Sequence, residues 1–363
     1  MMDLASQEAC GAGISFVECR RTTEVIMGAR NLQNMAPAIN ALRRRCGQED
    51  DFTTDPRYFI AANTLKHRRV AAVLIHREGE LEACVLFFEH CRLGMGLGVF
   101  RGGDGIGESL VAGREPLRVQ YVHLATQALL HNWRIHGVSL VMMAPVGQCI
   151  GIMESHDTQC MFAGRNIQRK LALAPSYRSM LSSMGHRTRR SLAGKRQQLE
   201  RSSQIQFVPS LDLAEARDAM LKLRPRSYPP RTSAFYYARC KVVAGNPDFF
   251  CMGIRLPNGV WLSVLSGWRR NQVTYVDLQM NDMHRKKESL SAVMRAYLLE
   301  HEINRGQQLI SFVGGTSLLL RRYCHTIEPC THAFVWRPCL RATLFKLIVP
   351  HLQPRSVYQR VQC

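Results

Sequence analysis

The chain has 363 residues, of which 46% are hydrophobic and 21% charged, a composition that excludes a disordered protein and fits two domains of ordinary size. Its formal net charge of +20 favours polyanionic partners such as nucleic acid, acidic glycans, anionic lipid or phosphorylated cofactors, without choosing among them. Thirteen cysteines without a repeated C-x-x-C pair indicate reduced thiols. With neither a signal-peptide pattern at Met1-Met2-Asp3-Leu4 nor a run long enough for a membrane span, we expect a soluble cytoplasmic protein.

The first half of the chain begins with a weakly patterned segment, residues 1–50, to which we assign no chemistry. Two apolar runs, 70–75 and 81–88, flank the turn Arg77-Glu78-Gly79-Glu80 and predict a β-hairpin. A glycine-rich stretch, 94–107, matches neither a P-loop nor a dinucleotide-binding motif, and we interpret it as a flexible loop or a bulged strand.

A helix is predicted from Pro116 to about His136, with Gly137 as its stop and residues 138–143 as the next strand. Residues 144–175 lack periodicity and are predicted to connect the two halves.

A basic amphipathic helix is predicted over 177–201, with an apolar stripe beside an excess of arginine and lysine. Two readings stay open for this helix, a solvated basic face and a contact for a polyanion.

The second half continues with a short strand, 205–208, and a helix, 211–223, that Arg224-Pro225 should end. Two strands, 249–256 and 260–268, flank Pro257-Asn258-Gly259, which is a strong hairpin signal.

The stretch from Val273 to Gly306 predicts a strand, a short basic loop and a helix. The strand alternates, with one row apolar from Val276 onward, and the helix keeps apolar residues at helical spacing from Leu290. Ser289 fits the N-cap and Gly306 the C′ position. The start of this helix should therefore face the basic loop, a place suited to phosphate groups; a solvated basic loop over an ordinary crossover helix is the alternative.

The chain then shows a short buried strand, 309–313, a glycine pair at Gly314-Gly315, a helical segment, 316–323, and a last strand, 332–336. Both halves show the order hairpin, further strand, helix, short apolar strand, which predicts a duplicated mixed α/β unit; two unrelated mixed α/β domains are the alternative. We expect an N-terminal extension (1–50), an N-terminal domain (51–165), a C-terminal domain (166–345) and a tail (346–363).

A three-strand meander followed by a loop, a helix and a parallel strand resembles the GNAT acyltransferase fold. More specifically, the chain resembles the FemAB-like double-GNAT acetyltransferases, which include the CelD/BcsL type of cellulose and exopolysaccharide biosynthesis. The likeness is carried by a Y-x-x-x-L-S pattern from Tyr177 with a basic R-R-x-L run from Arg189, by the strand–loop–helix of 275–290, and by Phe312-Val313-Gly314-Gly315 with Arg321-Arg322-Tyr323.

The resemblance implies two tandem GNAT-like domains and an acyltransferase that takes an acyl group from acetyl-CoA or another acyl-CoA, without a metal. The acceptor would be an amine or hydroxyl of a sugar, a polysaccharide precursor or a small metabolite. It implies a donor site in the C-terminal domain formed by the residues Met280, Arg285, Lys286, Lys287, Ser289, Leu290 and Gly314. The diphosphate would lie over Lys286, Lys287 and the N–H groups of Ser289 and Leu290.

Asp282 and His284 are the candidates for the catalytic base, and Tyr323 for the acid that protonates the leaving thiolate. Each has a structural alternative, namely an Asx-turn residue, a surface histidine and a packed aromatic ring. The usual glycine-bearing GNAT loop is absent, since Arg285-Lys286-Lys287-Glu288-Ser289-Leu290 occupies its place.

Two other functions remain open. One is an aminoacyl-tRNA-dependent transferase of the peptidoglycan-branching FemAB type, which the net positive charge would suit. The other is a non-catalytic module that binds a polyanion through its basic surface. A zinc site is not expected, because the spacing of Cys324, Cys330, His332 and Cys339 fits no familiar pattern.

Overall fold

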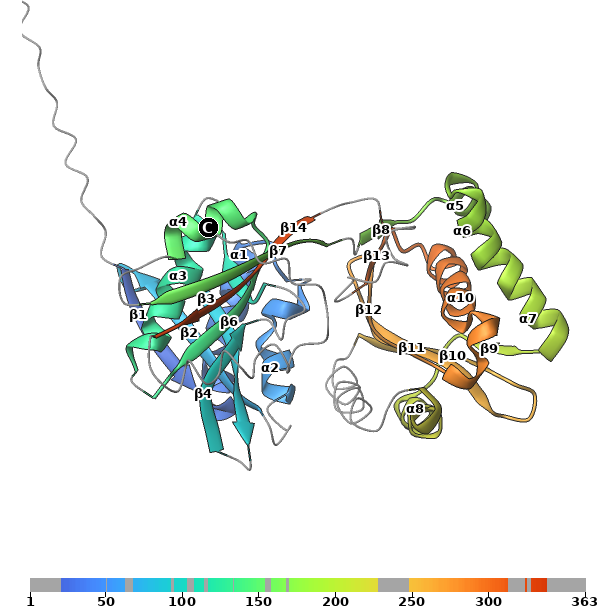
Figure 1. Cartoon of the computed structure of the whole chain (residues 1–363), viewed down its shortest axis with the longest axis horizontal. Coiled ribbons are helices and arrows are strands. Elements are labelled where there is room, and N and C mark those ends of the chain that lie inside the picture. The colour runs from blue at the N-terminus through green and yellow to red at the C-terminus, as the bar shows by residue number, and fades with distance from the viewer. Residues whose placement is uncertain are drawn as a thin grey trace, which may run out of the picture.

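The structure is a computed structural model, and it describes residues 21–49, 51–62, 68–92, 95–102, 108–113, 117–132, 134–153, 158–167, 170–227, 248–312, 324 and 328–337. These residues form two halves, each built around its own sheet (Figure 1). The chain is thus a mixed α/β protein, as the hydrophobic patterns predicted. None of the helices described is long and apolar enough to cross a membrane.

The first sheet has the strand order β1-β2-β3-β4-β6-β14-β7, and β5 also pairs with β3. Its strands are β1 (Arg21–Met27), β2 (Arg68–Arg77), β3 (Glu80–Arg92), β4 (Met95–Gly102), β5 (Leu110–Ala112), β6 (Gly137–Met142), β7 (Gln159–Ile167) and β14 (Glu328–Trp336). The predicted hairpin is confirmed as β2 and β3, and residues 95–102 of the glycine-rich stretch form strand β4. Antiparallel pairs join β2, β3 and β4, whereas β4 and β6 run parallel.

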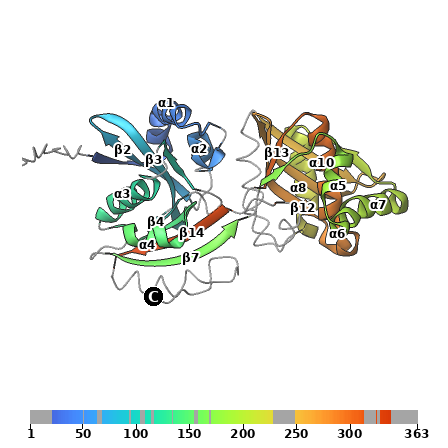
Figure 2. The ribbon, with the colours of Figure 1, turned by 90° about the horizontal axis from the view of Figure 1, so that it is seen from above.

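Helices cover both faces of this sheet (Figure 2). On one face lie α1 (Ala29–Arg45) and α2 (Pro56–Ala62), on the other α3 (Arg118–His131) and α4 (Val146–Met153). Strand β2 serves both cores, because Val70, Ala72 and Leu74 pack toward α1 whereas Ala71, Val73 and Ile75 pack toward α3. Burial on both faces explains why this strand reads as a continuous apolar run.

The second sheet has the order β8-β13-β12-β11-β10-β9. Its strands are β8 (Lys170–Ala172), β9 (Gln206–Val208), β10 (Phe249–Arg255), β11 (Trp261–Arg270), β12 (Val273–Asn281) and β13 (Leu309–Phe312). The hairpin at Pro257-Asn258-Gly259 is confirmed, with Gly259 at a φ of 82°. Strands β10, β11 and β12 are antiparallel, and β12 and β13 run parallel.

One face of the second sheet packs against α10 (Leu290–Asn304) and the segment α5–α7, the other against α8 (Leu213–Ser227). The segment α5–α7 consists of α5 (Tyr177–Ser183), α6 (His186–Arg189), a π-helical turn η4 (Arg190–Gly194) and α7 (Lys195–Ser203). The single helix predicted over 177–201 is therefore wrong in part, since Met184 and Gly185 are extended and break it.

Both halves thus repeat the predicted order, in which a three-strand meander leads through a helix to a strand parallel to the last one. The crossover helix is α3 in the first half and α10 in the second. Tyr58 of α2 packs against Trp268 of the second half, so the halves touch at these two rings.

The prediction that residues 144–175 merely connect the halves is wrong. This stretch contains α4, β7 and β8, and it supplies a strand to each sheet. Strands β7 and β8 were not predicted because they are edge strands, which are short or half-exposed and therefore show a weak apolar alternation.

Strand β14 lies in the first sheet, between β6 and β7, although the expected boundaries put it in the C-terminal domain. Thr331 pairs with Met142 of β6 on one side and with Gly164 of β7 on the other. The end of the described chain therefore completes the sheet of the first half, and no local pattern could have shown this pairing.

Two predicted helix ends are also wrong. Helix α3 stops at His131 and not near His136, and Gly137 begins β6, where an added Cβ would lie 2.9 Å from the Phe334 ring. Gly137 thus allows the close approach of β14. Helix α8 continues through Pro225, because Arg226 and Ser227 hold its last turn by hydrogen bonds to Trp261 and Leu223.

Candidate functional site

The candidate site lies where β12 leads into α10. Among the residues described, β12 pairs with β13 from Val273 to Val276, while its pairing with β11 continues to Asn281. The segment of β12 after Val276 therefore has one strand partner in the described chain. A strand with a free edge next to the start of a crossover helix is a common setting for a ligand in α/β folds.

A β-bulge at Asp277 reverses the sheet faces that the following side chains of β12 occupy. Gly267 pairs with Val276 and Ser266 with Leu278, so Asp277 has no counterpart on β11. As a result, Val276 packs toward α10, whereas Leu278 and Met280 pack toward α8. The predicted apolar row is buried, but it does not lie on one face, because a bulge reverses the side-chain alternation.

Beyond the bulge, Gln279 and Asn281 occupy the face toward α10. The amide nitrogen of Gln279 donates to Oδ1 of Asn281 at 3.2 Å and to the carbonyl of Ser291, in the first turn of α10, at 3.3 Å. Ser263 also donates to Oδ1 of Asn281, at 2.8 Å. Polar side chains therefore line the edge of β12 next to the start of α10. Their signal in the sequence is the polar row that alternates with the apolar row of β12.

Asp282 is buried, and its carboxylate is fully engaged. Oδ2 accepts from Nη1 of Arg226 at 2.5 Å, and Oδ1 accepts from the backbone N–H of His284 at 3.0 Å. Asp282 thus caps the short 3₁₀ helix η5 (Met283–Glu288), which is the Asx-turn role that the sequence left open. This geometry favours a structural role for Asp282. Arg226, its partner, lies 56 residues away and carried no local signal.

The basic loop is η5, and its cations differ in their surroundings. Arg285 is engaged, since Nε lies 2.7 Å from Oε1 of Glu288 and Nη2 lies 3.4 Å from Oγ of Ser203. Lys286, Lys287 and His284 are exposed, and their side chains bond no acidic group in the described chain. The two lysines are therefore the charges of this loop that a ligand could use.

Ser289 lies at the N-cap of α10 as predicted, but in a left-handed conformation with φ of 55° and no side-chain capping bond. Its N–H donates to the Lys286 carbonyl at 3.2 Å and is thus occupied. By helix geometry, the N–H groups of Leu290 and Ser291 have no partner within the helix, and they point out of its positive end. An anion at this place would meet Leu290 and Ser291 rather than Ser289.

Other predicted site residues lie apart from this arrangement. The Met280 side chain packs against α8 and that of Leu290 is buried in the α10 core, so only their backbones can meet a ligand. Gly314 and Tyr323 lie outside the described residues.

A polar network joins α7 to α10 beside the site. Arg196 bonds Glu200 at 2.9 Å and Glu300 at 2.6 Å, and its guanidinium lies 4.0 Å from the Tyr297 ring centre. The Tyr297 hydroxyl donates to Glu200 at 2.6 Å; burial, the bond to Glu200 and its negative charge together raise the pKa of Tyr297 above its ordinary value of 10.0. This network fixes the position of α7 on α10, so its aromatic and acidic groups are structural.

The segment α5–α7 carries exposed cations. We name as the basic face the residues Arg178, Arg187, Arg189, Arg190 and Arg201. None of them bonds an acidic side chain in the described chain. This segment forms the outer edge of the second half (Figure 1). An accumulation of unpaired positive charge of this kind attracts polyanions.

In the described part of the chain, no three His, Cys, Asp or Glu side chains come together as ligands for a metal ion. Of the cysteines and the histidine that lie near one another in the sequence here, Cys324 and Cys330 are buried and form no disulfide among the described residues. Burial raises the pKa of the Cys324 thiol to about 11, which disfavours the thiolate that would bind a metal.

The two sheets, each with a meander, a crossover helix and a parallel strand, form a double GNAT fold. FemX is similar to this chain with a TM-score of 0.58 and 9% identity, over 86% of this chain and 98% of FemX. A tandem GNAT protein of the clavulanic acid biosynthesis pathway is similar with a TM-score of 0.51 and 9% identity, over 87% and 98%.

A GCN5-related glucosamine N-acetyltransferase region of a fungal multi-domain beta-N-acetylglucosaminidase is similar with a TM-score of 0.51 and 11% identity. This match covers 87% of our chain and 38% of the fungal one. No family model and no curated protein matches the sequence. The predicted resemblance to the FemAB-like double-GNAT fold is therefore confirmed by structure.

Proposed function

We propose that this protein is a CoA-dependent acyltransferase whose acyl donor binds in the second half, between β12 and the start of α10. The observation that carries the proposal is the position of Lys286 and Lys287. They are exposed, without acidic partners in the described chain, and lie in η5, within one turn of the N-terminus of α10. Positive side chains next to a helix N-terminus hold phosphate groups well.

The diphosphate of CoA would lie over Lys286, Lys287 and the N–H groups of Leu290 and Ser291. The acyl-pantetheine arm would then follow the edge of β12 past Gln279 and Asn281, which can hydrogen-bond its amides. Glu288 does not oppose the diphosphate strongly, because its Oε1 is bound to Arg285. Gly314 is proposed to contact the donor from the chain that follows β13.

In the reaction, a lone pair of the acceptor amine or hydroxyl attacks the thioester carbonyl, the C–S bond breaks, and the proton of the acceptor passes to a base. We assign His284 as this base, because its side chain is exposed whereas Asp282 is buried in an ion pair. Tyr323 is the proposed acid that protonates the leaving thiolate.

The proposed acceptor is an amine or hydroxyl of a sugar, a polysaccharide precursor such as one of cellulose or exopolysaccharide synthesis, or a small metabolite. A sugar amine is supported by the fold shared with the glucosamine N-acetyltransferase region. We place the reaction in the cytoplasm, in keeping with the free thiols of the described cysteines.

Calorimetry with acetyl-CoA and longer acyl-CoAs tests the donor. We expect the wild type to bind acyl-CoA. The double variant Lys286→Gln, Lys287→Gln should bind it about tenfold more weakly, since each lysine forms a charge-assisted contact with phosphate. Lys222→Gln, an exposed lysine of α8 paired with Asp218, is the matched control and should bind normally. If no acyl-CoA binds the wild type, the proposal is wrong.

An aminoacyl-tRNA-dependent transfer is the second candidate, and the basic face is the observation that favours it. FemX shares the fold, and the five arginines of the basic face, which bond no acidic side chain in the described chain, suit a nucleic acid backbone. In this case tRNA should bind with an affinity that falls steeply with added salt, and CoA should not compete. If tRNA binds but no acyl transfer occurs with either donor, the chain is a polyanion-binding module instead.

A further inference from the structure

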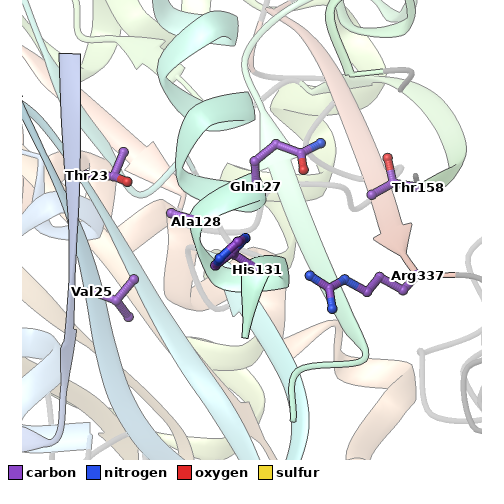
Figure 3. A pocket seen from close by; sticks show the side chains of 7 residues that line it. All are labelled: Thr23, Val25, Gln127, Ala128, His131, Thr158 and Arg337. Carbon is purple, nitrogen blue, oxygen red and sulfur yellow. The ribbon is translucent and has the colours of Figure 1, made fainter. Parts of the chain in front are cut away.

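A groove of about 520 Å³ lies in the first half, away from the proposed donor site. Its lining residues are Thr23, Val25, Gln127, Ala128, His131, Thr158 and Arg337. Figure 3 shows that the Arg337 guanidinium extends toward the side of the groove where His131 lies. The volume lies within the range of about 300 to 1,000 Å³ that is usual for small-molecule sites.

The groove is assembled from four elements that the sequence separates widely. Thr23 and Val25 come from β1, the edge strand of the first sheet, and Gln127, Ala128 and His131 from the end of α3. Thr158 directly precedes β7, and Arg337 directly follows β14. Arg337 therefore reaches the groove only because β14 is inserted between β6 and β7.

The charge of the described lining is positive. None of its seven residues is acidic, and the Arg337 guanidinium bonds no acidic group in the described chain. His131 lies in the last turn of α3, and its ring lines the same groove as Arg337. A guanidinium that is not neutralised within the protein is a strong donor for a carboxylate or a phosphate, because both accept its paired N–H groups.

We propose that this groove is a second small-molecule site, which binds a ligand carrying a carboxylate or a phosphate. The oxyanion lies between Arg337 and His131, while Val25 and Ala128 contact an apolar part of the same molecule. Thr23, Gln127 and Thr158 supply polar contacts at the rim. The site is independent of the proposed acyl transfer, since it is built on the other sheet.

A ligand bound here would touch β1, α3 and the end of β14 together. It would therefore stabilise the inserted strand, because a ligand that binds only the folded arrangement shifts the equilibrium toward it. Protection of the β14 amides from hydrogen exchange is a readout at this site alone, which an anion bound to the basic face would not change.

The experiment is calorimetry in low-salt buffer with two probes, inorganic phosphate and succinate, combined with hydrogen exchange of β14. We expect one or both to bind and to protect β14; binding of phosphate alone or succinate alone identifies the preferred oxyanion. Arg337→Gln should weaken binding about tenfold or more, because it removes the paired charge-assisted hydrogen bonds. Arg337→Lys should retain part of the affinity, since it keeps the charge but loses the planar fork.

Arg217→Gln is the matched control, because Arg217 is an exposed arginine of α8 without a partner in the described chain. Arg337 is half-buried at the surface, and a thermal melt of each variant will show that it is folded. Two results would overturn the proposal: neither probe binds the wild type at up to about 10 mM, a limit corresponding to very weak affinity, or Arg337→Gln binds as tightly as the wild type.

Discussion

Arg226 and Asp282 form an ion pair across 56 residues of sequence, with Nη1 of the arginine 2.5 Å from Oδ2 of the aspartate. The side chain of Asp282 is 3% exposed and that of Arg226 is 28% exposed. This pair ties the last turn of α8 to the end of β12, and it sets the direction in which η5 leaves the strand. The orientation of the proposed donor site thus depends on a helix from the opposite face of the sheet.

Breaking this pair should destabilise the protein more than removing an exposed pair. We expect Arg226→Ala to cost about 3 kcal/mol in the free energy of unfolding, because a buried carboxylate is left without its cation. The exposed pair of Lys222 with Asp218 should contribute less than about 0.5 kcal/mol. Urea unfolding of both single variants measures the difference, and similar costs for the two would contradict it.

Removing the negative charge of Glu288 should strengthen ligand binding, whereas removing the charges of Lys286 and Lys287 should weaken it. Its carboxylate holds Arg285 at 2.7 Å beside the proposed diphosphate seat. Glu288→Gln should free the guanidinium and remove a negative charge, and so tighten acyl-CoA binding about threefold to tenfold, since surface charges at this range interact by roughly 1 kcal/mol. Calorimetry at low salt measures this change. Weaker binding by the variant would mean that the diphosphate lies elsewhere.

Strand β14 should behave as part of the first half. Val335 is fully buried on this strand, between Val138 of β6 and Cys160 of β7. Val335→Ala should cost about 2 kcal/mol of stability, because it leaves a cavity in the core. Hydrogen exchange should then rise in both β6 and β7. An increase confined to the second half would show that β14 does not occupy this position in solution.

The ionised Asp55 should stabilise the fold, so that the protein loses stability in acid. Burial opposes its ionisation, but hydrogen bonds from Arg57 and the charge of Arg43 outweigh burial and lower the pKa of Asp55 below its ordinary value of 3.8. A carboxyl group whose pKa is lower in the folded state than in the unfolded state stabilises the protein at pH values above the unfolded-state pKa. This stabilisation is lost as the pH falls through the folded-state pKa. The Asp55 contribution should therefore begin to fall below about pH 4 and be lost as the pH falls further, through the lowered pKa of the folded state.

Urea unfolding at several pH values between about 2.5 and 6 tests this prediction. Asp55→Asn should be less stable than the wild type at pH 6, and the two proteins should converge as the pH falls. A constant difference between them at every pH would show that the Asp55 charge does not contribute.

The local elements could be predicted from the sequence because each is encoded within a short window. The turn at Pro257-Asn258-Gly259, the alternation of β12 and the helical spacing after Leu290 are all of this kind. The same order of elements in both halves was visible for that reason, and it led to the correct fold.

The candidate site was predicted only in part. The loop of Lys286 and Lys287 before α10 was identified from its residues, whereas Arg226, Gln279 and Asn281 were missed. The role of Asp282 depends on Arg226, and the side to which Met280 points depends on the bulge at Asp277. Neither can be derived from a window of ten residues.

The sequence by itself determined elements such as the hairpin of β10 and β11, the strand β12 and the helix α10 with its preceding basic loop, because backbone and turn preferences act between near neighbours. Only the tertiary structure decided that β14 completes the first sheet, where Thr331 bonds the carbonyl of Ala144 from 187 residues away, and that Arg337 and His131 line one groove. Such pairings follow from the burial of whole faces and from backbone hydrogen bonds between distant strands, which no local pattern encodes.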